Sequence, residues 1–145
     1  MFEIRRITLE DVINLRHSVL RPHQSIEDCV YESDREETTF HIGAYLNGEL
    51  VSIASFNKEV SDAFESDNQT RLRAMATLPA YRKLGAGRLI VEFAEKILKE
   101  QGVSLLWCKG RVNVKAYYHK LGFTEYGEAF DYPPIGLHVL LCKEL

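Results

Sequence analysis

Two glycines with basic neighbours, Gly85 and Gly87, form the stretch of this chain whose residue types best suit binding chemistry. They lie between an extended segment, 70–77, and a strongly periodic helical segment that ends at Gln101. The first N–H groups of a helix have no partner within it and carry the positive end of its dipole, so they bind anions. Glycine keeps side chains out of the way. The pattern predicts a phosphate-binding turn from strand to helix.

Three basic residues surround the glycines: Arg82, Lys83 and Arg88. The whole chain has a formal charge of −3, so this positive charge is local. A local cluster favours one bound anion over a general nucleic-acid surface. Two glycines can also simply permit a tight connection. Other phosphate loops fit less well, because no Gly-Lys-Ser/Thr follows and the third glycine of a dinucleotide fingerprint is replaced by Ile90.

Two longer strings carry a family resemblance. Residues 75–87 contain Arg82-Lys83-Leu84-Gly85-Ala86-Gly87 after a strand, a proline and an aromatic residue, and residues 111–123 end in Tyr118-His119-Lys120-Leu121-Gly122-Phe123. The first resembles the acetyl-CoA signature Arg/Gln-x-x-Gly-x-Gly/Ala of the GCN5-related N-acetyltransferase (GNAT) family, and the second resembles that family's helix before Gly-Phe. The resemblance covers residues 39–145, and residues 1–38 only in the order of elements.

The resemblance implies the GNAT fold, a mixed α/β sheet whose fourth and fifth strands splay apart around the pantetheine arm of acetyl-CoA. The main chain of the fourth strand would pair with that arm and polarise the thioester carbonyl, and the turn with the start of its helix would hold the phosphates. The residues implied are Met75, Ala76, Thr77, Arg82, Lys83, Leu84, Gly85, Ala86, Gly87 and Arg88.

Tyr118 aligns with the family's tyrosine, four residues before Gly122. A phenol with a pKa near 10 is protonated at neutral pH and can donate a proton to the departing thiolate. Tyr117 is expected to pack in the core. The family's cofactor-contacting asparagine aligns with Arg111, which becomes a candidate contact to the cofactor, and Asn113 is expected to be a helix N-cap.

The general base is left open. His138 is the first candidate, on the face of its strand opposite Ile135, Leu137 and Val139, which suits a cleft or solvent. A lone histidine there is more often structural. Glu32, His41, Glu128 and a chain of water molecules are the alternatives. Cys108 could suggest an acyl-enzyme, but no histidine or acid accompanies it in a recognisable pattern.

The composition predicts a single domain over residues 1–145. The chain is 46% hydrophobic and 27% charged, enough to bury a core without staples. Its three cysteines are far apart and lack a C-x-x-C pair, so reduced thiols and no metal site are expected. No signal-peptide or membrane-span pattern occurs. We expect a cytoplasmic protein without nucleic-acid or membrane partners, and a homodimer is left open.

The elements that must position these residues follow the order β-α-β-β-β-α-β-α-β-β. A strand at 2–7 precedes a helix to Leu20, with Thr8 and Asp11 as a capping box. Asn47-Gly48 predicts a type I′ hairpin between strands 39–46 and 50–56. The later elements expected are strand 70–77, the helix after the glycines up to Gly102, strand 104–109, helix 113–121, and strands 123–130 and 135–143.

Two further expectations concern charged residues. The helix after the glycines should pair Glu92 with Lys96 and Glu95 with Lys99. The acids of segment 21–38, which borders the acceptor groove in the resembled family, could attract a cationic amine. A run of charge is more often a solvated face.

The function we infer is transfer of acetyl from acetyl-CoA to a primary amine by direct attack, without an acyl-enzyme. The acceptor, a small molecule or a protein amine, is not identified by the sequence. The competing class is a non-catalytic module that binds CoA as a sensor or interaction surface. A nucleotide-binding domain is a third, weaker interpretation.

Overall fold

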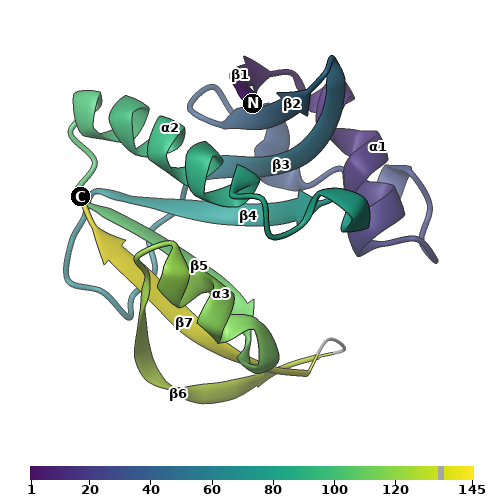
Figure 1. The fold of residues 1–145 in the computed structure, drawn as a ribbon. Coiled ribbons are helices and arrows are strands. Elements are labelled where there is room, and N and C mark those ends of the chain that lie inside the picture. The colour runs from purple at the N-terminus through teal and green to yellow at the C-terminus, as the bar shows by residue number, and fades with distance from the viewer. Residues whose placement is uncertain (134–135) are drawn as a thin grey trace.

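The predicted order of elements is confirmed in the computed structural model, which describes residues 1–133 and 136–145 (Figure 1). The described residues also include four short 3₁₀ turns in the connections. The strands and α-helices are β1 (Glu3–Ile7), α1 (Leu9–Leu20), β2 (Phe40–Leu46), β3 (Glu49–Lys58), β4 (Gln69–Thr77), α2 (Ala86–Glu100), β5 (Leu105–Arg111), α3 (Lys115–Lys120), β6 (Thr124–Tyr132) and β7 (Gly136–Glu144).

All seven strands belong to one mixed sheet in the order β1-β2-β3-β4-β5-β7-β6. Neighbouring strands are antiparallel except β4 and β5, which are parallel because α2 forms a crossover between them. The last two strands begin and end one or two residues later than expected, and Ile135 lies outside the described residues.

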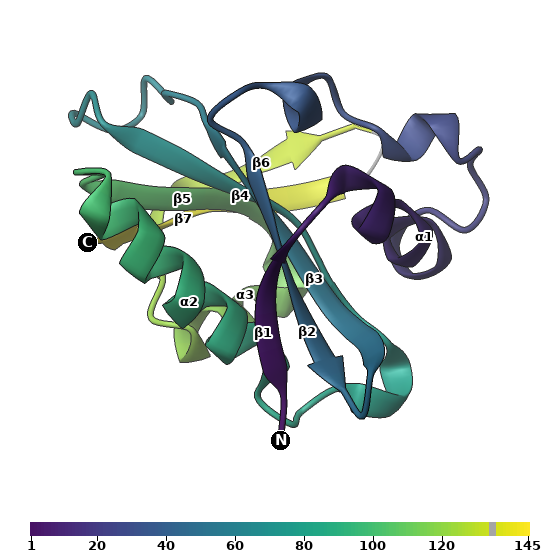
Figure 2. The same ribbon diagram turned by 90° about the horizontal axis from the view of Figure 1, so that it is seen from above.

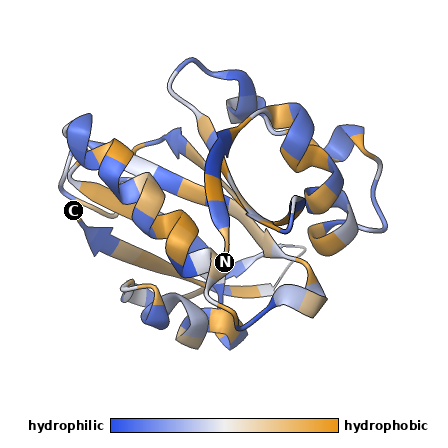
Figure 3. Cartoon of the chain, turned by 45° about the horizontal axis from the view of Figure 1, so that its top comes forward, coloured by the Kyte–Doolittle hydropathy of each residue, from blue (hydrophilic) through white to orange (hydrophobic). Residues whose placement is uncertain are grey.

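Helices cover both faces of the sheet (Figure 2). The larger apolar cluster lies on the face of the sheet that α2 and α3 cover. It includes Phe56, Ile90, Leu106 and Phe123. A smaller cluster joins α1 to the opposite face and includes Val12 of α1 and Ile53 of β3. Apolar and polar residues alternate around α2 (Figure 3), as expected of a helix with one buried side.

Local sequence signals explain several boundaries. Asn47 and Gly48 both have positive φ, 51° and 83°, as a type I′ turn requires, so the predicted hairpin is confirmed. The carboxylate of Asp11 accepts a hydrogen bond from the Thr8 N–H at 3.2 Å, which confirms the expected cap of α1. No helix in the described part of the chain is long and apolar enough to cross a membrane.

Candidate active site

The sheet opens between β4 and β5. These strands pair only at Gln69–Leu105, Thr70–Leu106 and Arg71–Trp107, and they diverge beyond that point (Figure 1). The register between β3 and β4 shifts by one residue before Ala76, and Ala74 there has a positive φ of 53°. A bulge of this kind bends a strand and increases its twist. From Leu72 to Thr77, β4 therefore has no partner strand on its β5 side among the described residues.

The start of α2 carries unpaired backbone donors. The first hydrogen bond into the helix runs from the Leu89 N–H to the Gly85 carbonyl at 3.2 Å, and the N–H groups of Ala86, Gly87 and Arg88 have no acceptor in the described residues. Gly85 is the N-cap and has a φ of 91°, a conformation that glycine adopts without strain. The turn has the features of an anion site.

The basic side chains of the turn are already partly engaged. The Arg82 Nε donates to the Thr77 carbonyl at 3.1 Å, and Arg88 forms an ion pair with Glu92 at 2.8 Å. Lys83 is exposed, with a positive φ of 66°, and Leu84 is 58% exposed. The predicted pairs of Glu92 with Lys96 and Glu95 with Lys99 are wrong, because the two glutamates bind other partners, Arg88 and Lys143.

Tyr117 is not the core residue that the sequence suggested. It is 41% exposed, and its hydroxyl donates to the sulfur of Met75 at 3.4 Å. A Cβ added to Gly87 would lie 1.9 Å from the same oxygen. Tyr117 therefore connects β4 with the start of α2, and Gly87 is needed for this contact as well as for access to the helix N–H groups.

Tyr118 is the more buried of the two tyrosines. Its ring packs edge-on against Phe123 and Tyr117, and a Cβ on Gly110 of β5 would approach its Cε2 to 3.1 Å. Burial raises the pKa of Tyr118 above its usual value, with smaller contributions from Cys108 and Tyr117. The phenol is therefore protonated at any physiological pH, and its hydroxyl has no hydrogen-bond partner among the described residues.

Cys108 has no features of a nucleophile. It is 2% exposed, and burial raises the pKa of its thiol. The thiolate is the reactive form of cysteine, so this residue stays inert. All three cysteines are free, as expected.

The candidate bases are scattered. His138 is buried, at 4% exposed, and does not face solvent; its Nδ1 lies 2.9 Å from the Gly136 carbonyl. His41 is also buried, and Glu32 and Glu128 are exposed. Leu137 was expected on the same face as Val139, but it is 61% exposed. It lies at the start of β7, opposite Asp131 of the edge strand β6.

The helix-cap prediction for Asn113 is wrong. Asn113 lies within the 3₁₀ turn Val112–Val114, and α3 begins after Val114 without a side-chain cap. Arg111 is exposed at the end of β5, opposite His138 of β7. Both residues lie near the hairpin β6–β7 rather than at the turn before α2.

Sequence reasoning missed a buried ion pair between α1 and the segment that connects it to β2. The guanidinium of Arg16 binds both carboxylate oxygens of Asp34 at 2.7 Å and the hydroxyl of Ser55 at 2.8 Å. Arg16 and Asp34 are 18 residues apart, and in the sequence they resemble surface charges. No local pattern could have paired them. The solvated-face interpretation holds for Glu32 and Glu36 and is wrong for Asp34.

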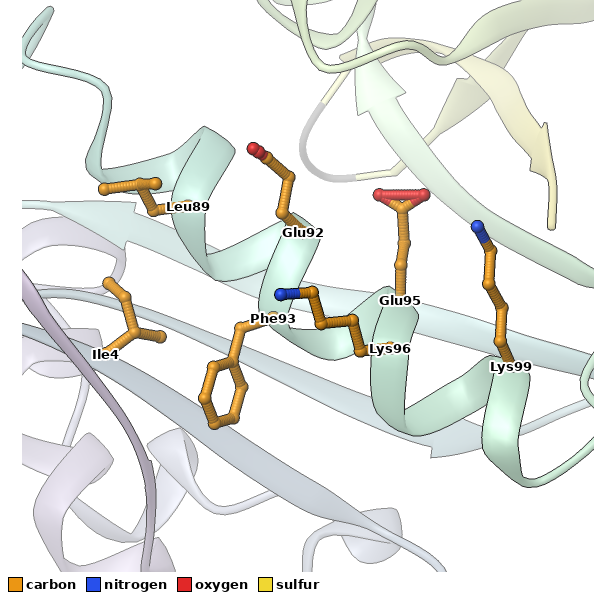
Figure 4. A pocket seen from close by; sticks show the side chains of 7 residues that line it. All are labelled: Ile4, Leu89, Glu92, Phe93, Glu95, Lys96 and Lys99. Atoms are coloured by element: carbon orange, nitrogen blue, oxygen red, sulfur yellow. The ribbon is translucent and has the colours of Figure 1, made fainter.

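A hollow of about 460 Å³ lies on another part of the surface (Figure 4). Its lining combines Ile4 of β1 with Leu89, Glu92, Phe93, Glu95, Lys96 and Lys99 of α2. The two glutamates and two lysines of this wall balance in charge, and none of the predicted site residues lines it. We therefore assign the site to the opening between β4 and β5.

The sequence profile of the Acetyltransferase (GNAT) family matches residues 5–123. The chain belongs to this family. It is 46% identical over 145 residues to YitI, an uncharacterized N-acetyltransferase of Bacillus subtilis. The alignment covers 100% of this chain and 97% of the relative. The family predicted from the two motifs is confirmed.

Solved structures support the same fold. Escherichia coli ElaA has a TM-score of 0.78 and 16% identity, with 99% of this chain and 100% of that chain covered. An aminoglycoside 6′-N-acetyltransferase complexed with coenzyme A has a TM-score of 0.77 and 12% identity, with 98% of this chain and 96% of that chain covered. The GNAT fold is thus confirmed over nearly the whole chain.

Proposed function

We propose that this protein transfers an acetyl group from acetyl-CoA to a primary amine by direct attack. One observation carries the proposal: the open edge of β4 leads to the unpaired N–H groups at the start of α2, and Tyr118 lies beside the same opening at Gly110. An extended thiol-bearing arm with a phosphate end fits this arrangement. The sequence motifs of the family fall on the same elements.

The two ends of the opening suit the two ends of the donor. The N–H groups of Ala86, Gly87 and Arg88 would bind the pyrophosphate, with Lys83 adding charge from the exposed turn. The unpaired edge of Met75, Ala76 and Thr77 would pair with the pantetheine amides as an added strand does. An N–H group of this edge would also stabilise negative charge on the thioester oxygen.

Bond making and breaking would then need two proton transfers. The amine nitrogen forms the new N–C bond with the acetyl carbon, and the C–S bond to CoA breaks. Tyr118 donates its proton to the departing sulfur. Burial keeps the phenol protonated but also makes it a weaker acid, so the proton moves as negative charge develops on the sulfur. The amine loses its proton to His138 or to water. Cys108 stays outside the reaction because its thiol is buried and protonated.

The test uses the purified protein, acetyl-CoA and a panel of primary amines, with release of free thiol as the measurement. We expect thiol release that depends on the amine, and calorimetry should show binding of CoA but not of ATP or NAD. Binding of CoA without turnover of any amine would support a non-catalytic CoA-binding module instead. Equal binding of ATP would contradict the proposal.

A further inference from the structure

Two cations, Arg73 of β4 and Lys109 of β5, lie on the two strands that border the opening, on the side of the sheet opposite α2. Arg71 and Trp107 form the last pair between β4 and β5, and Arg73 and Lys109 lie two residues further along these parallel strands. Side chains two residues apart on a strand share a face. Arg73 and Lys109 therefore border the gap on the side of Arg71 and Trp107, where an acceptor would approach the thioester.

Neither cation has an anionic partner. The guanidinium of Arg73 lies 4.3 Å from the ring centroid of Tyr31, and the Lys109 ammonium lies 4.8 Å from that of Tyr132. Among the described residues, no hydrogen bond or ion pair involves either side chain. Arg71 beside them is paired with Glu59 at 3.1 Å, yet its buried Nε has no acceptor.

The local charge is positive enough to affect neighbouring groups. Burial and the charge of Arg71 lower the pKa of Arg73. The pKa of Tyr132 is also lowered: its partial burial opposes the change, but a hydrogen bond from Arg71 and the charges of Lys109 and Arg73 outweigh it. A patch whose cations destabilise one another is stabilised when an anion binds between them.

Acidic side chains line a hollow beside Arg73. Arg73 lines a hollow of about 270 Å³ together with Glu32, Ser33, Glu36, Asn57, Lys58 and Glu59. Glu59 is engaged by Arg71, and Glu32 and Glu36 are exposed. Arg73 therefore shares this hollow with three glutamates, and Lys109 lies outside its lining. That distribution suits a small ligand with both signs of charge.

We propose that the acceptor is a small amine with a carboxylate close to the amine, of the amino-acid class, and that Arg73 and Lys109 bind this carboxylate. The inference rests on the proposed function. Arginine presents a planar pair of donors that matches a carboxylate, and a desolvated contact of this kind is strong. The rings of Tyr31 and Tyr132 would enclose the rest of the molecule.

The experiment compares matched acceptors with purified protein and saturating acetyl-CoA. Each of the common amino acids is assayed against its amide and its decarboxylated amine, for example phenylalanine against phenylalaninamide and phenethylamine. We expect kcat/KM for the best acid to exceed that of its two carboxylate-free partners by at least tenfold. Arg73→Gln and Lys109→Gln should each raise KM for the acid about tenfold more than they raise KM for the carboxylate-free amines, with CoA affinity unchanged. Lys58→Gln, at the same hollow, is the control.

Two results separate this inference from the proposed function. Efficient turnover of carboxylate-free amines, with no preference for acids and no effect of Arg73→Gln, would overturn the carboxylate site and leave the acetyltransferase activity intact. If no amine is turned over, the proposed function fails, and calorimetry of the same acids and amides with the CoA-loaded protein decides the binding site separately. Absence of any acid-selective binding there would overturn the inference.

Discussion

Tyr118 can pack closely against β5 because residue 110 is a glycine. A Cβ on Gly110 would lie 2.7 Å from Leu141 and 3.1 Å from the Tyr118 ring, so glycine lets α3 approach β5 closely. Phe123 and Tyr117 hold the ring from other sides. The hydroxyl is thereby presented on a rigid ring, in its protonated form. Such positioning is what a general acid requires.

Tyr118→Phe removes one oxygen and keeps the packing of the ring. We expect unchanged folding and acetyl-CoA affinity, with kcat lower by roughly 10²-fold, a typical contribution of a positioned general acid. Tyr117→Phe is the matched comparison: it loses a weak contact to the Met75 sulfur and should affect kcat much less. Rapid single-turnover measurements isolate the chemical step. Equal rates for Tyr118→Phe and wild type would remove this residue from the mechanism.

Residue roles were the least predictable part of the site. Adjacent tyrosines, Tyr117 and Tyr118, differ in burial because one points across to Met75 and the other packs on β5, and a helix periodicity alone does not decide which. Asn113 has the residue type of a cap but lies inside a 3₁₀ turn. The cationic pair of Arg73 and Lys109 depends on where two strands diverge, which no local pattern reveals.

The sequence predicted the helices and strands much better than the roles of single residues, because the signals for these elements are local. Asn47-Gly48 specifies its turn through backbone conformation, and the glycine turn with the apolar stripe of α2 specifies strand, turn and helix in order. Ion pairs differ from expectation where a residue of a distant element competes for the same partner. Lys143 of β7 binds Glu95, which the helix pattern assigned to Lys99. An i,i+4 pair is weak enough to lose such a competition.

The start of α2 can be tested without straining the backbone. Gly85 has positive φ and Gly87 contacts Tyr117, so an aspartate at either position would disturb the fold as well as any ligand. Leu84 is 58% exposed and adjacent to the turn. We expect Leu84→Asp to weaken CoA binding roughly tenfold relative to Leu84→Asn, because only the charge differs between them. Calorimetry at low salt measures the ratio, and equal affinities would contradict phosphate binding at this turn.

On the scale of the whole molecule, one buried network holds the segment between α1 and β2 against the sheet. Arg16 of α1 binds Asp34, Ser55 of β3 and the Cys29 carbonyl at 2.7 Å, and the N–H of Tyr31 donates to the same carboxylate at 2.6 Å. The polar segment between α1 and β2 is thus held by charge-assisted hydrogen bonds rather than by apolar packing. Tyr31, which packs on Arg73, depends on this network.

Breaking the buried pair should destabilise the protein strongly. Asp34→Asn leaves the Arg16 charge buried without its partner, and we expect a loss of about 3 kcal/mol or more in the free energy of unfolding. Glu37→Gln, at an exposed acid nearby in sequence, is the control and should change stability by less than about 0.5 kcal/mol. Urea unfolding followed by circular dichroism gives both values. Equal stability of the two variants would show that the pair contributes little.

The same network makes stability depend on pH through His41. Burial lowers the pKa of His41 despite the nearby Asp34 carboxylate, and Ser55, whose oxygen accepts from Arg16, can donate its proton to the neutral imidazole at 2.7 Å. The unfolded chain therefore binds a proton at a higher pH than the folded chain does, and stability falls as pH drops below about 6.5, by up to about 1.4 kcal/mol per pH unit. Asp34, whose pKa is lowered by Arg16 and Tyr31 against the effect of burial, adds its own loss of stability only at a lower pH, below about 4.

Urea titrations between pH 7.5 and pH 5 should show this pH dependence of stability in wild type and in His23→Gln, which changes an exposed histidine, and a flatter profile in His41→Gln. An unchanged slope in His41→Gln would mean that His41 is not the group that titrates.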